Sequence, residues 1–234
     1  MNNNKSQKTS DSKQKFTLLL ILICVVGVLG AKVAFEKMRE AKMKQSRIAA
    51  RSKGNAASDL HIIEHIDFQC PACAFGSKML KEYFDKYPDK MFVEMRYHPL
   101  TMHTHSFLSA RYAECAARQG KFWPFQDSLV ERQTEWSPLL NPVPVFEDIA
   151  KKAGVDLPTL NSCISDPEVD KLIKEELDQG TALGVRSTPA YFVNGNMLVG
   201  ANNLKNVFDQ RFPQPASTSQ PAPQSAPATG GTAK

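Results

Sequence analysis

The sequence lacks the features that would assign it at once to several large classes of protein. Its formal net charge is only +5 over 234 residues, and residues 32–53 carry much of that excess, so the middle of the chain is close to neutral. A nucleic-acid-binding domain should carry its own basic face, and nucleic acid is therefore not an expected partner. The apolar share of 42% is normal for a soluble core and excludes a polytopic membrane protein, and no internal repeat is visible.

Cysteine is also scarce. The chain has five cysteines, of which Cys24 lies in an apolar run and is set aside. The remaining four make an even number: Cys70 and Cys73 form a C-x-x-C, whereas Cys115 and Cys163 stand apart. An even number downstream of an export signal is typical of proteins from an oxidising compartment.

One long apolar run, FTLLLILICVVGVLGA, covers residues 16–31 and follows a polar start at residues 1–15. If Lys32 snorkels, the span extends to residue 35 and reaches about 20 residues, the length that a membrane crossing needs. We therefore predict a transmembrane signal anchor over residues 16–35, with residues 1–15 as a polar cytoplasmic tail. A cleaved signal peptide is the alternative, because Leu29-Gly30-Ala31 is a passable cleavage site.

The segments on either side of the globular part have simple compositions. Residues 36–58 are predicted to form a helical spacer and linker, because residues 32–53 contain no Pro or Gly and are rich in helix formers. A loose apolar stripe leaves a second interpretation open, in which residues 32–53 dimerise or lie on a lipid surface. The globular domain is expected over residues 59–212. Residues 213–234 are rich in Pro, Ala and Ser and are expected to be a disordered tail.

Between these segments the pattern alternates between strand-like and helix-like stretches. The expected elements are a buried strand at His61–Phe68, a helix at 71–87, a strand at Met91–Tyr97, a helical block at about 103–184, a β-hairpin turning at Asn194-Gly195 and a closing helix at 203–212. This order predicts an α/β protein in which a helical block interrupts a β-α-β and a β-β-α unit.

Cys70 and Cys73 fall at a strand-to-helix junction. We expect Cys70 at the N-cap and Pro71 at the first helical position, where its missing N–H costs nothing. The free N–H groups and partial positive charge of a helix start stabilise a thiolate, so the pKa of Cys70 should be low. Cys73, one turn further along and more buried, should stay a thiol and resolve a mixed disulfide formed on Cys70.

Two other interpretations of the cysteine pair were weighed. A lone C-x-x-C is half of a zinc site, and the other half would come from histidines or from the two remaining cysteines, namely His98, His103 and His105 or Cys115 and Cys163. A purely structural disulfide is the other alternative. We favour redox chemistry, because no second C-x-x-C exists and because a proline inside the pair at a helix start suits thiol exchange.

Far down the chain, Thr188-Pro189 precedes a short apolar run. Taken alone, this pattern indicates a trans proline that opens an edge strand. An X-Pro bond is the only kind that becomes cis at low cost. In a chain that also carries a C-x-x-C earlier in the sequence, we favour a cis bond between Thr188 and Pro189.

Together, the motifs IDFQCPAC, YHPL, GKFWPF and GVRSTPAYFVNG resemble the DsbA-like family of thiol–disulfide oxidoreductases, in the thioredoxin superfamily. The resemblance covers roughly residues 59–212 and implies a thioredoxin-like fold with an inserted helical domain. It implies that Cys70 is the nucleophile and Cys73 the resolving cysteine. Thr188 and cis-Pro189 would face the pair, and the Thr188 backbone would hold an extended substrate by strand addition. Pro71 and Ala72, between the cysteines, would also contact substrate.

The resemblance extends to a carboxylate and to a second pair of cysteines. Glu64, six residues before Cys70, matches the buried acid that assists proton transfer at the resolving cysteine, and a buried carboxylate should have a raised pKa. A partly exposed Glu64 is the alternative. A structural disulfide between Cys115 and Cys163, as some relatives have, is favoured over two free buried cysteines. It would stabilise the inserted block by about 3–4 kcal/mol on the chain-entropy estimate.

The resemblance implies an enzyme that introduces disulfide bonds into unfolded or reduced exported proteins and is reoxidised by a DsbB-type, quinone-linked membrane partner. No cofactor and no metal are expected. The catalytic domain would lie in the bacterial periplasm on an inner-membrane anchor. The excess of Lys and Arg after the span argues for the opposite orientation, but the chemistry is more useful outside.

The sequence departs from the best-known oxidases at Ala72, where they carry His, and Thr188 is more typical of isomerase-like relatives. Ala72 should leave Cys70 less acidic than in the strongest oxidases. A dimeric isomerase or reductase assembled through residues 32–53, and a non-enzymatic envelope protein that has kept the fold, are therefore the alternatives.

Overall fold

The computed structural model describes residues 4–212, apart from the side chains of residues 4–21, 24, 40, 43 and 44. The expected disordered tail at residues 213–234 lies outside the described residues. The elements, in chain order, are α1 (Asn4–Ala50), β1 (Ser52–Gly54), β2 (His61–Ile66), α2 (Pro71–Lys86), the 3₁₀ helix η1 (Pro88–Lys90), β3 (Phe92–Tyr97), α3 (Ser106–Arg118), α4 (Phe122–Glu131), α5 (Gln133–Trp136), α6 (Val143–Lys152), α7 (Leu157–Ile164), α8 (Pro167–Ala182), β4 (Ala190–Val193), β5 (Asn196–Val199) and α9 (Ala201–Arg211). The predicted strands, the helix after the cysteine pair, the hairpin and the closing helix are all present.

The strands form a five-stranded sheet in the order β1-β3-β2-β4-β5. β2 and β3 run parallel, and the other neighbouring strands are antiparallel. Asn194 and Gly195 both have positive φ, 48° and 84°, which is the backbone of a tight two-residue hairpin turn. The sheet places β2, which leads into the cysteine pair, directly beside β4, which follows Thr188-Pro189.

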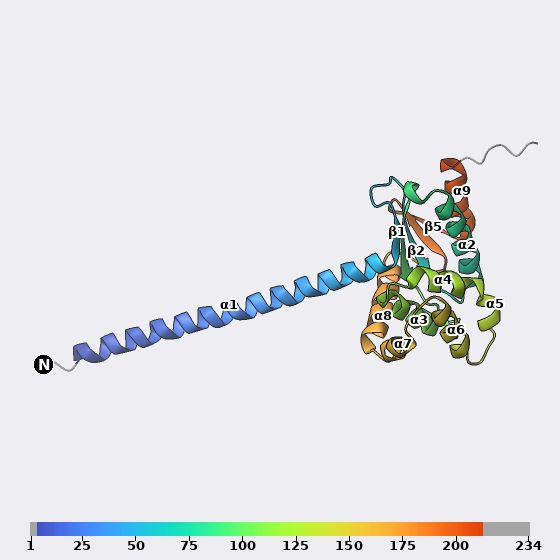
Figure 1. Ribbon diagram of the computed structural model, residues 1–234. Helices are drawn as coiled ribbons and strands as arrows, with labels where there is room; N and C mark the ends of the chain where they lie inside the picture. Colours follow the sequence, from blue (N-terminus) through green and yellow to red (C-terminus); the bar gives the residue numbers. More distant parts are fainter. Residues whose placement is uncertain (1–3, 213–234) are drawn as a thin grey trace, which may run out of the picture.

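Helices cover both faces of the sheet (Figure 1). On one face α2 packs over β2 and β4, where Ser77 of α2 reaches Glu64 of β2. On the other face α8 packs over His65 and His98, because Gly180 leaves no room for a Cβ between α8 and the two imidazole rings. Successive residues of a strand point to opposite faces, so Glu64 and His65 contact different helical layers.

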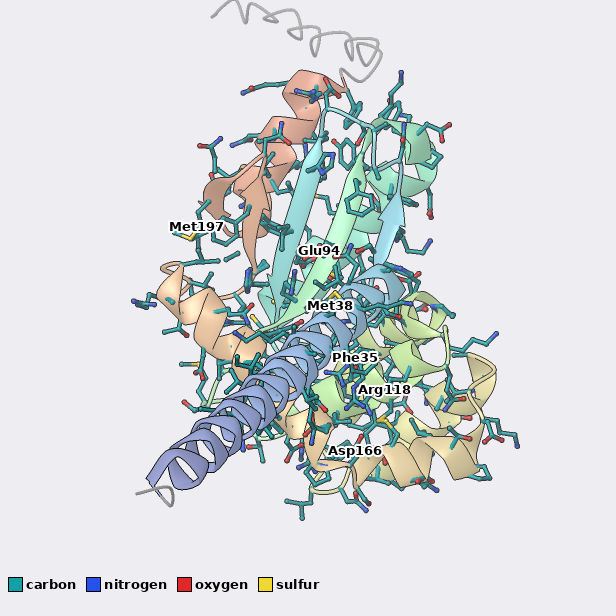
Figure 2. All side chains as sticks on the ribbon, turned by 90° about the vertical axis from the view of Figure 1, so that its left-hand side faces the viewer. Phe35, Met38, Glu94, Arg118, Asp166 and Met197 are labelled. Carbon is teal, nitrogen blue, oxygen red and sulfur yellow. A yellow bond between two sulfur atoms is a disulfide. The ribbon has the colours of Figure 1, made fainter. Side chains whose placement is uncertain are left out.

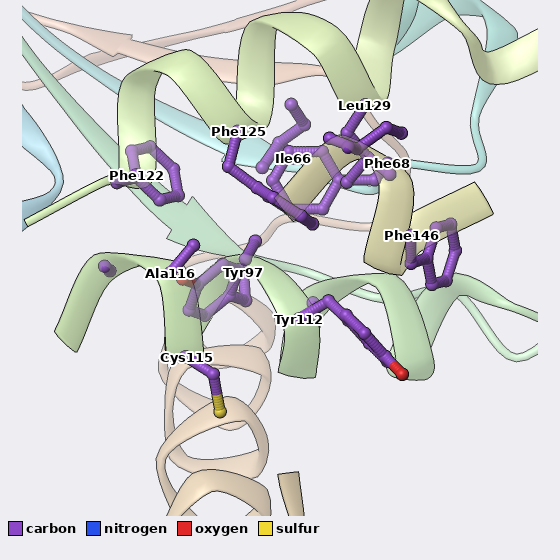
Figure 3. Packing of buried hydrophobic residues seen from close by; sticks show 14 of the residues in the cluster. Ile66, Phe68, Tyr97, Tyr112, Cys115, Ala116, Phe122, Phe125, Leu129 and Phe146 are labelled. Atoms are coloured by element: carbon purple, nitrogen blue, oxygen red, sulfur yellow. The ribbon is translucent and has the colours of Figure 1, made fainter. Parts of the chain in front are cut away.

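The inserted helices α3 to α8 have a core of their own that continues onto the end of the sheet (Figure 3). Phe125, Trp136 and Phe146 are each 0% exposed at its centre, and the Trp136 and Phe146 rings lie edge to face with centroids 5.1 Å apart. A second apolar cluster fills the space between the sheet, α2 and α9. The cysteine pair lies at the border of the first cluster, between the insert and the sheet.

At the N-terminal side, one helix of 47 residues covers the stretch for which an anchor and a spacer helix were predicted. The first part of the predicted anchor, residues 16–21, has side chains outside the described set. Between Leu22 and Met38 the described large apolar side chains of α1 are exposed, among them Phe35 and Met38 (Figure 2). Within the described part of the chain, no helix is long and apolar enough to cross a membrane.

The structure moves the start of the globular domain toward the N-terminus, from the expected residue 59 to Arg51. Ser52–Gly54, expected in a linker, form β1 and pair with β3. Arg51 is 0% exposed. Its guanidinium donates to both carboxylate oxygens of Glu176, at 2.8 and 2.6 Å, and stacks 4.4 Å from the ring centre of Tyr97. Sequence reasoning missed this because Arg51 follows a run of exposed cations that resembles a solvated helix.

Candidate active site

The two cysteines of the C-x-x-C lie where β2 gives way to α2. Cys70 is the N-cap residue, with φ −73° and ψ 121°, and Pro71 occupies the first turn. Cys73 lies one turn into α2 and is 0% exposed, whereas Cys70 is 8% exposed. Pro71 and Ala72 between them are exposed. Pro71 and Ala72 are therefore at the surface, Cys70 keeps a small exposed area beside them, and Cys73 is fully buried.

The environment separates the acidities of the two thiols. A hydrogen bond from the Cys73 side chain, with further hydrogen bonds from the backbone of Cys73 and Ala72, lowers the pKa of Cys70 to about 5 in spite of its burial. Burial raises the pKa of Cys73 well above its ordinary value, and the neighbouring Cys70 and Glu64 raise it further. Cys70 is therefore a thiolate at neutral pH, and Cys73 holds its proton.

The peptide bond between Thr188 and Pro189 is cis, as predicted. The Cys70 Sγ lies 3.5 Å from the Thr188 carbonyl oxygen, so the cis-proline loop and the cysteine pair meet although 118 residues separate Cys70 from Thr188 in the sequence. Thr188 is 8% exposed. The loop at Thr188-Pro189, directly before the first residue of β4, therefore lies against Cys70 and forms the other side of the site.

Glu64 lies on β2 beneath α2 and is 0% exposed, which excludes the alternative of a partly exposed side chain. Its Oε1 accepts a hydrogen bond from the Ser77 hydroxyl at 3.4 Å. Burial raises the pKa of Glu64 to about 8. A carboxyl group with this pKa can both accept and release a proton near neutral pH.

Sequence reasoning missed a set of polar residues that hold the strand-to-helix junction in place. The Gln133 amide of α5 donates to the carbonyl oxygens of Phe68, at 2.7 Å, and Cys70, at 2.9 Å. Asp67 accepts from the backbone N–H of Gln69 at 2.8 Å and lies 2.6 Å from the Nδ1 of His103. Asp67 and Gln69 adjoin the motif and could have been suspected. Gln133 carries no local signal, because only the fold brings α5 to the junction.

In the inserted block, Cys115 of α3 and Cys163 of α7 are joined in a disulfide. The bridge lies away from the C-x-x-C, whose cysteines are both free thiols. Because Cys115 and Cys163 are bonded to each other, they are not available as ligands for a metal at Cys70 and Cys73. The zinc alternative that depended on them is therefore removed.

Comparison with known families agrees with this geometry. A family model described as "Thioredoxin" matches residues 46–209. The chain belongs to this thioredoxin family. The match begins before Arg51 and so includes β1, the strand that the sequence pattern had left in the linker.

Solved structures of thiol–disulfide exchange proteins have the same fold. The thiol-disulfide exchange protein alpha-DsbA2 from Wolbachia pipientis is 22% identical, with a TM-score of 0.59, and the match covers 76% of this chain and 98% of that one. BdbD from Bacillus subtilis is 18% identical, with a TM-score of 0.59, covering 70% and 93%. A thioredoxin-like oxidoreductase from Silicibacter pomeroyi is 24% identical, with a TM-score of 0.56, covering 68% and 90%. The fold is thus that of the DsbA-type thiol–disulfide oxidoreductases.

Among curated proteins, the chain is similar to parts of several Na(+)/H(+) antiporters. It is 29% identical over 154 residues to the Na(+)/H(+) antiporter NhaA 3 of Salinispora tropica, which is 65% of this chain and 23% of that protein. It is 28% identical over 157 residues to the Na(+)/H(+) antiporter NhaA of Herminiimonas arsenicoxydans, covering 66% and 24%. The chain therefore spans about a quarter of these relatives, and their names describe the whole proteins rather than the aligned parts.

Proposed function

We propose that the protein catalyses thiol–disulfide exchange through Cys70 and Cys73. The observation that carries the proposal is the acidic Cys70 thiol at the start of α2, 3.5 Å from the carbonyl oxygen that precedes a cis-proline. A thiolate at this position attacks the disulfide of a substrate, and the buried Cys73 then displaces the substrate from the mixed disulfide. The exposed Pro71 and Ala72 and the loop at Thr188 leave an open approach to Cys70.

The favoured direction is oxidation of substrate thiols. Hydrogen bonds that stabilise the Cys70 thiolate stabilise the dithiol form of the pair, and a more stable dithiol makes the corresponding disulfide a stronger oxidant. A pKa of about 5 for Cys70 lies between the values of about 3.5 and about 7 that mark strongly oxidising and reducing members of the superfamily. This agrees with the weaker stabilisation expected from Ala72.

The natural substrates in this proposal are unfolded or reduced exported proteins in the periplasm, and a DsbB-type, quinone-linked membrane protein restores the disulfide. Attachment to the inner membrane through residues 16–35 completes the proposal. Its support is the series of exposed apolar side chains on α1 from Leu22 to Phe35. Carbonate extraction of cell membranes tests the attachment: release of the full-length chain into the soluble fraction would rule it out.

The decisive variant is Cys70→Ser in the full chain. We expect it to abolish oxidation of a reduced peptide with two cysteines, because the Cys70–Cys73 disulfide that accepts the two electrons of the peptide can no longer form. The control is Cys73→Ser, which keeps the nucleophile. With a peptide that carries a disulfide, this control should accumulate a mixed disulfide on Cys70, because no thiol is left at position 73 to displace the peptide. Oxidation of the peptide by Cys70→Ser at the wild-type rate would contradict the proposal.

The same preparation separates an oxidase from a dimeric isomerase or reductase. We expect the Cys70–Cys73 pair of the cellular protein to be mostly oxidised and its reduction potential to lie above about −200 mV. A mostly reduced pair, a potential well below that value and a dimer that depends on residues 32–53 would instead assign the alternative function.

A further inference from the structure

Two polar groups are buried side by side beneath the cysteine pair. Glu64 and Tyr191 are each 0% exposed, and they are register partners on the neighbouring strands β2 and β4. Directly opposite residues of antiparallel strands have Cβ atoms about 5 Å apart on one face. The Glu64 Oε2 and the Tyr191 hydroxyl have no other partner within hydrogen-bond distance among the described residues, and the hydroxyl acts on Glu64 as a donor. The Tyr191 hydroxyl is therefore placed to exchange a proton with the Glu64 carboxyl group.

The helix above them is shaped to receive the tyrosine. Gly76 lies inside α2, three residues after Cys73, where glycine costs about 1 kcal/mol relative to alanine. A Cβ at position 76 would collide with the Tyr191 hydroxyl oxygen. Glycine at this position therefore lets the hydroxyl lie against the turn of α2 that follows Cys73.

Glu64 has no direct hydrogen bond to Cys73 in the described part of the chain. Its Oε1 takes the Ser77 hydroxyl at 3.4 Å, while the Cys73 Sγ accepts the Asp67 backbone N–H at 3.5 Å. A proton that moves between Cys73 and Glu64 therefore needs a carrier. A phenol hydroxyl is suited to this, because it donates one hydrogen bond and accepts another.

We propose that the Tyr191 hydroxyl carries the proton between Cys73 and Glu64 during disulfide exchange. The inference rests on the proposed function and adds a residue to it. With a mixed disulfide on Cys70, the Cys73 thiol gives its proton to the Tyr191 oxygen while the Tyr191 hydroxyl gives its own to the Glu64 carboxylate. The Cys73 thiolate then attacks the Cys70 sulfur. The Cys70–Cys73 bond forms, the bond to the substrate sulfur breaks, and the substrate leaves with the electron pair as a thiolate.

The same path serves substrate oxidation in reverse. A substrate thiolate attacks Cys70 of the disulfide, and Cys73 leaves as a thiolate. That thiolate takes up a proton from Tyr191, which is itself reprotonated by Glu64. The substrate's second thiolate then displaces Cys70, so that the substrate is oxidised by two electrons and the Cys70–Cys73 pair is reduced.

The charges around the hydroxyl are compatible with this role. Cys70 and Cys73 face it from α2 and Glu64 faces it from β2, while Lys53 of β1 acts on Glu64. Burial, followed by the charges of Glu64 and Cys73, raises the pKa of Tyr191 above its ordinary value. Tyr191 therefore stays protonated through the working pH range and can act only by exchanging one proton for another.

The test is Tyr191→Phe in the full chain, with Tyr112→Phe as the matched control. Tyr112 is a buried tyrosine of the inserted block, packed against Phe146 at 5.1 Å. A mixed disulfide is formed on Cys70 with a model peptide, and its resolution by Cys73 is followed from pH 5 to 9. We expect Tyr191→Phe to slow resolution at pH 7 by at least about tenfold, a threshold set below the roughly 10²–10⁴-fold that a positioned proton-transfer group contributes, and to remove the inflection near pH 8. Tyr112→Phe should leave both unchanged.

A double variant separates the relay from simple packing. If Tyr191 acts through Glu64, then Glu64→Gln with Tyr191→Phe should be no slower than Glu64→Gln alone. Additive losses in the double variant, or a wild-type pH profile in Tyr191→Phe, would overturn the relay. The proposed function would still stand in that case, provided that the wild type exchanges disulfides through Cys70. Loss of Cys70-dependent exchange in the wild type would overturn both.

Folding is checked by circular dichroism and by the unfolding midpoint. We expect Tyr191→Phe to fold, since it keeps the buried aromatic ring and removes only one hydroxyl group. If it does not fold, Gly76→Ala supplies the second test, because its Cβ displaces the hydroxyl without deleting it. The same tenfold loss and altered pH profile are expected, and a wild-type profile in a folded Gly76→Ala would overturn the relay.

Discussion

Glu64 and Glu176 are both buried carboxylates at the central sheet, on opposite sides of it, and their environments differ in one respect. Glu176 is contacted by a cation: Arg51 donates to both its oxygens, and the Tyr97 backbone N–H donates to Oε2 at 2.9 Å. Glu64 has only hydroxyl donors, those of Ser77 and Tyr191, and no cation in contact with it among the described residues. Burial alone would raise the pKa of either group, but Arg51 outweighs it and lowers the pKa of Glu176.

The difference shows how one fold uses the same residue type for two purposes. A carboxylate that is fully satisfied by a buried cation is fixed in its charged state and contributes to structure. A carboxyl group without a touching cation can change its protonation state near neutral pH. The two sides of the sheet therefore differ in role. On one side, Glu176 links α8 to Arg51, which follows α1, and on the other side Glu64 lies beneath the cysteine pair.

The variant with the largest expected effect is Arg51→Met. It removes the two shortest hydrogen bonds of Glu176, whose only remaining cation among the described residues is Arg96 at 3.4 Å, and it leaves the nearby Glu114 with Arg118 at 3.3 Å. We expect a loss of about 3–5 kcal/mol in the free energy of unfolding, the usual cost of removing one partner of a buried ion pair. Denaturant titration measures it. A loss below about 1 kcal/mol would show that the buried pair does not hold the domain together.

The matched control is Arg132→Met. Arg132 also makes two hydrogen bonds to one carboxylate, that of Glu135, both at 2.7 Å. Its side chain is 25% exposed and that of Glu135 is 48% exposed. Exposed pairs contribute about 1 kcal/mol or less, so this variant should unfold close to the wild type.

Glu64→Gln has a smaller effect on stability and the opposite sign. The folded-state pKa of about 8 is above the ordinary value of 4.5, so the folded state binds more protons between these values. The stability contributed by protonated Glu64 is complete below about pH 4.5 and is lost as the pH rises to about 8. Glutamine does not titrate, so we expect the variant to exceed the wild type at pH 8 by no more than about 4 kcal/mol, the limit set by the rise in pKa from 4.5 to about 8. The gain should shrink toward pH 4.

The measurement is the difference in unfolding free energy between Glu64→Gln and the reduced wild type at each pH, which cancels the titration of Cys70. Glu131→Gln, at an exposed position, is the control and should leave the pH dependence unchanged. A constant difference from pH 4 to 9 would contradict a raised pKa for Glu64.

The smallest expected effect is that of Lys53→Met. Lys53 is the cation that lowers the pKa of Glu64, but it lies against the rings of Phe84 and Trp123, with its Nζ 4.3 and 3.9 Å from their centroids. Its removal should raise the pKa of Glu64 further, by an amount worth less than about 1.4 kcal/mol, or one pKa unit. The inflection in the resolution rate should move to higher pH, and exposed Lys205→Met should leave it in place. A downward move would show that Lys53 acts through packing alone.

Much of the site was predictable because its signals are local. Cys70, Pro71 and Cys73 are adjacent in the sequence, and a helix start imposes the same geometry on them in any fold. The cis bond at Pro189 required the joint presence of two motifs. The role of Gln133 could not be predicted from the sequence. It depends on α5 lying against the strand-to-helix junction, and no sequence pattern near residue 133 indicates that contact.

The sequence by itself determined where β2, β3, α2, the hairpin turn and α9 lie, because apolar periodicity and turn residues act over a few positions. It did not reveal β1. It indicated the type of chemistry that is proposed for Cys70 and Cys73. Only the tertiary structure decided that Arg51 belongs to the core, that Glu64 loses contact with water and that Tyr191 lies beside it. The burial and the hydrogen-bond partners of these residues depend on contacts between elements that are distant in the sequence, namely β1, β2, β4, α2 and α8. These contacts, rather than the residue type, decide whether a buried glutamate is charged.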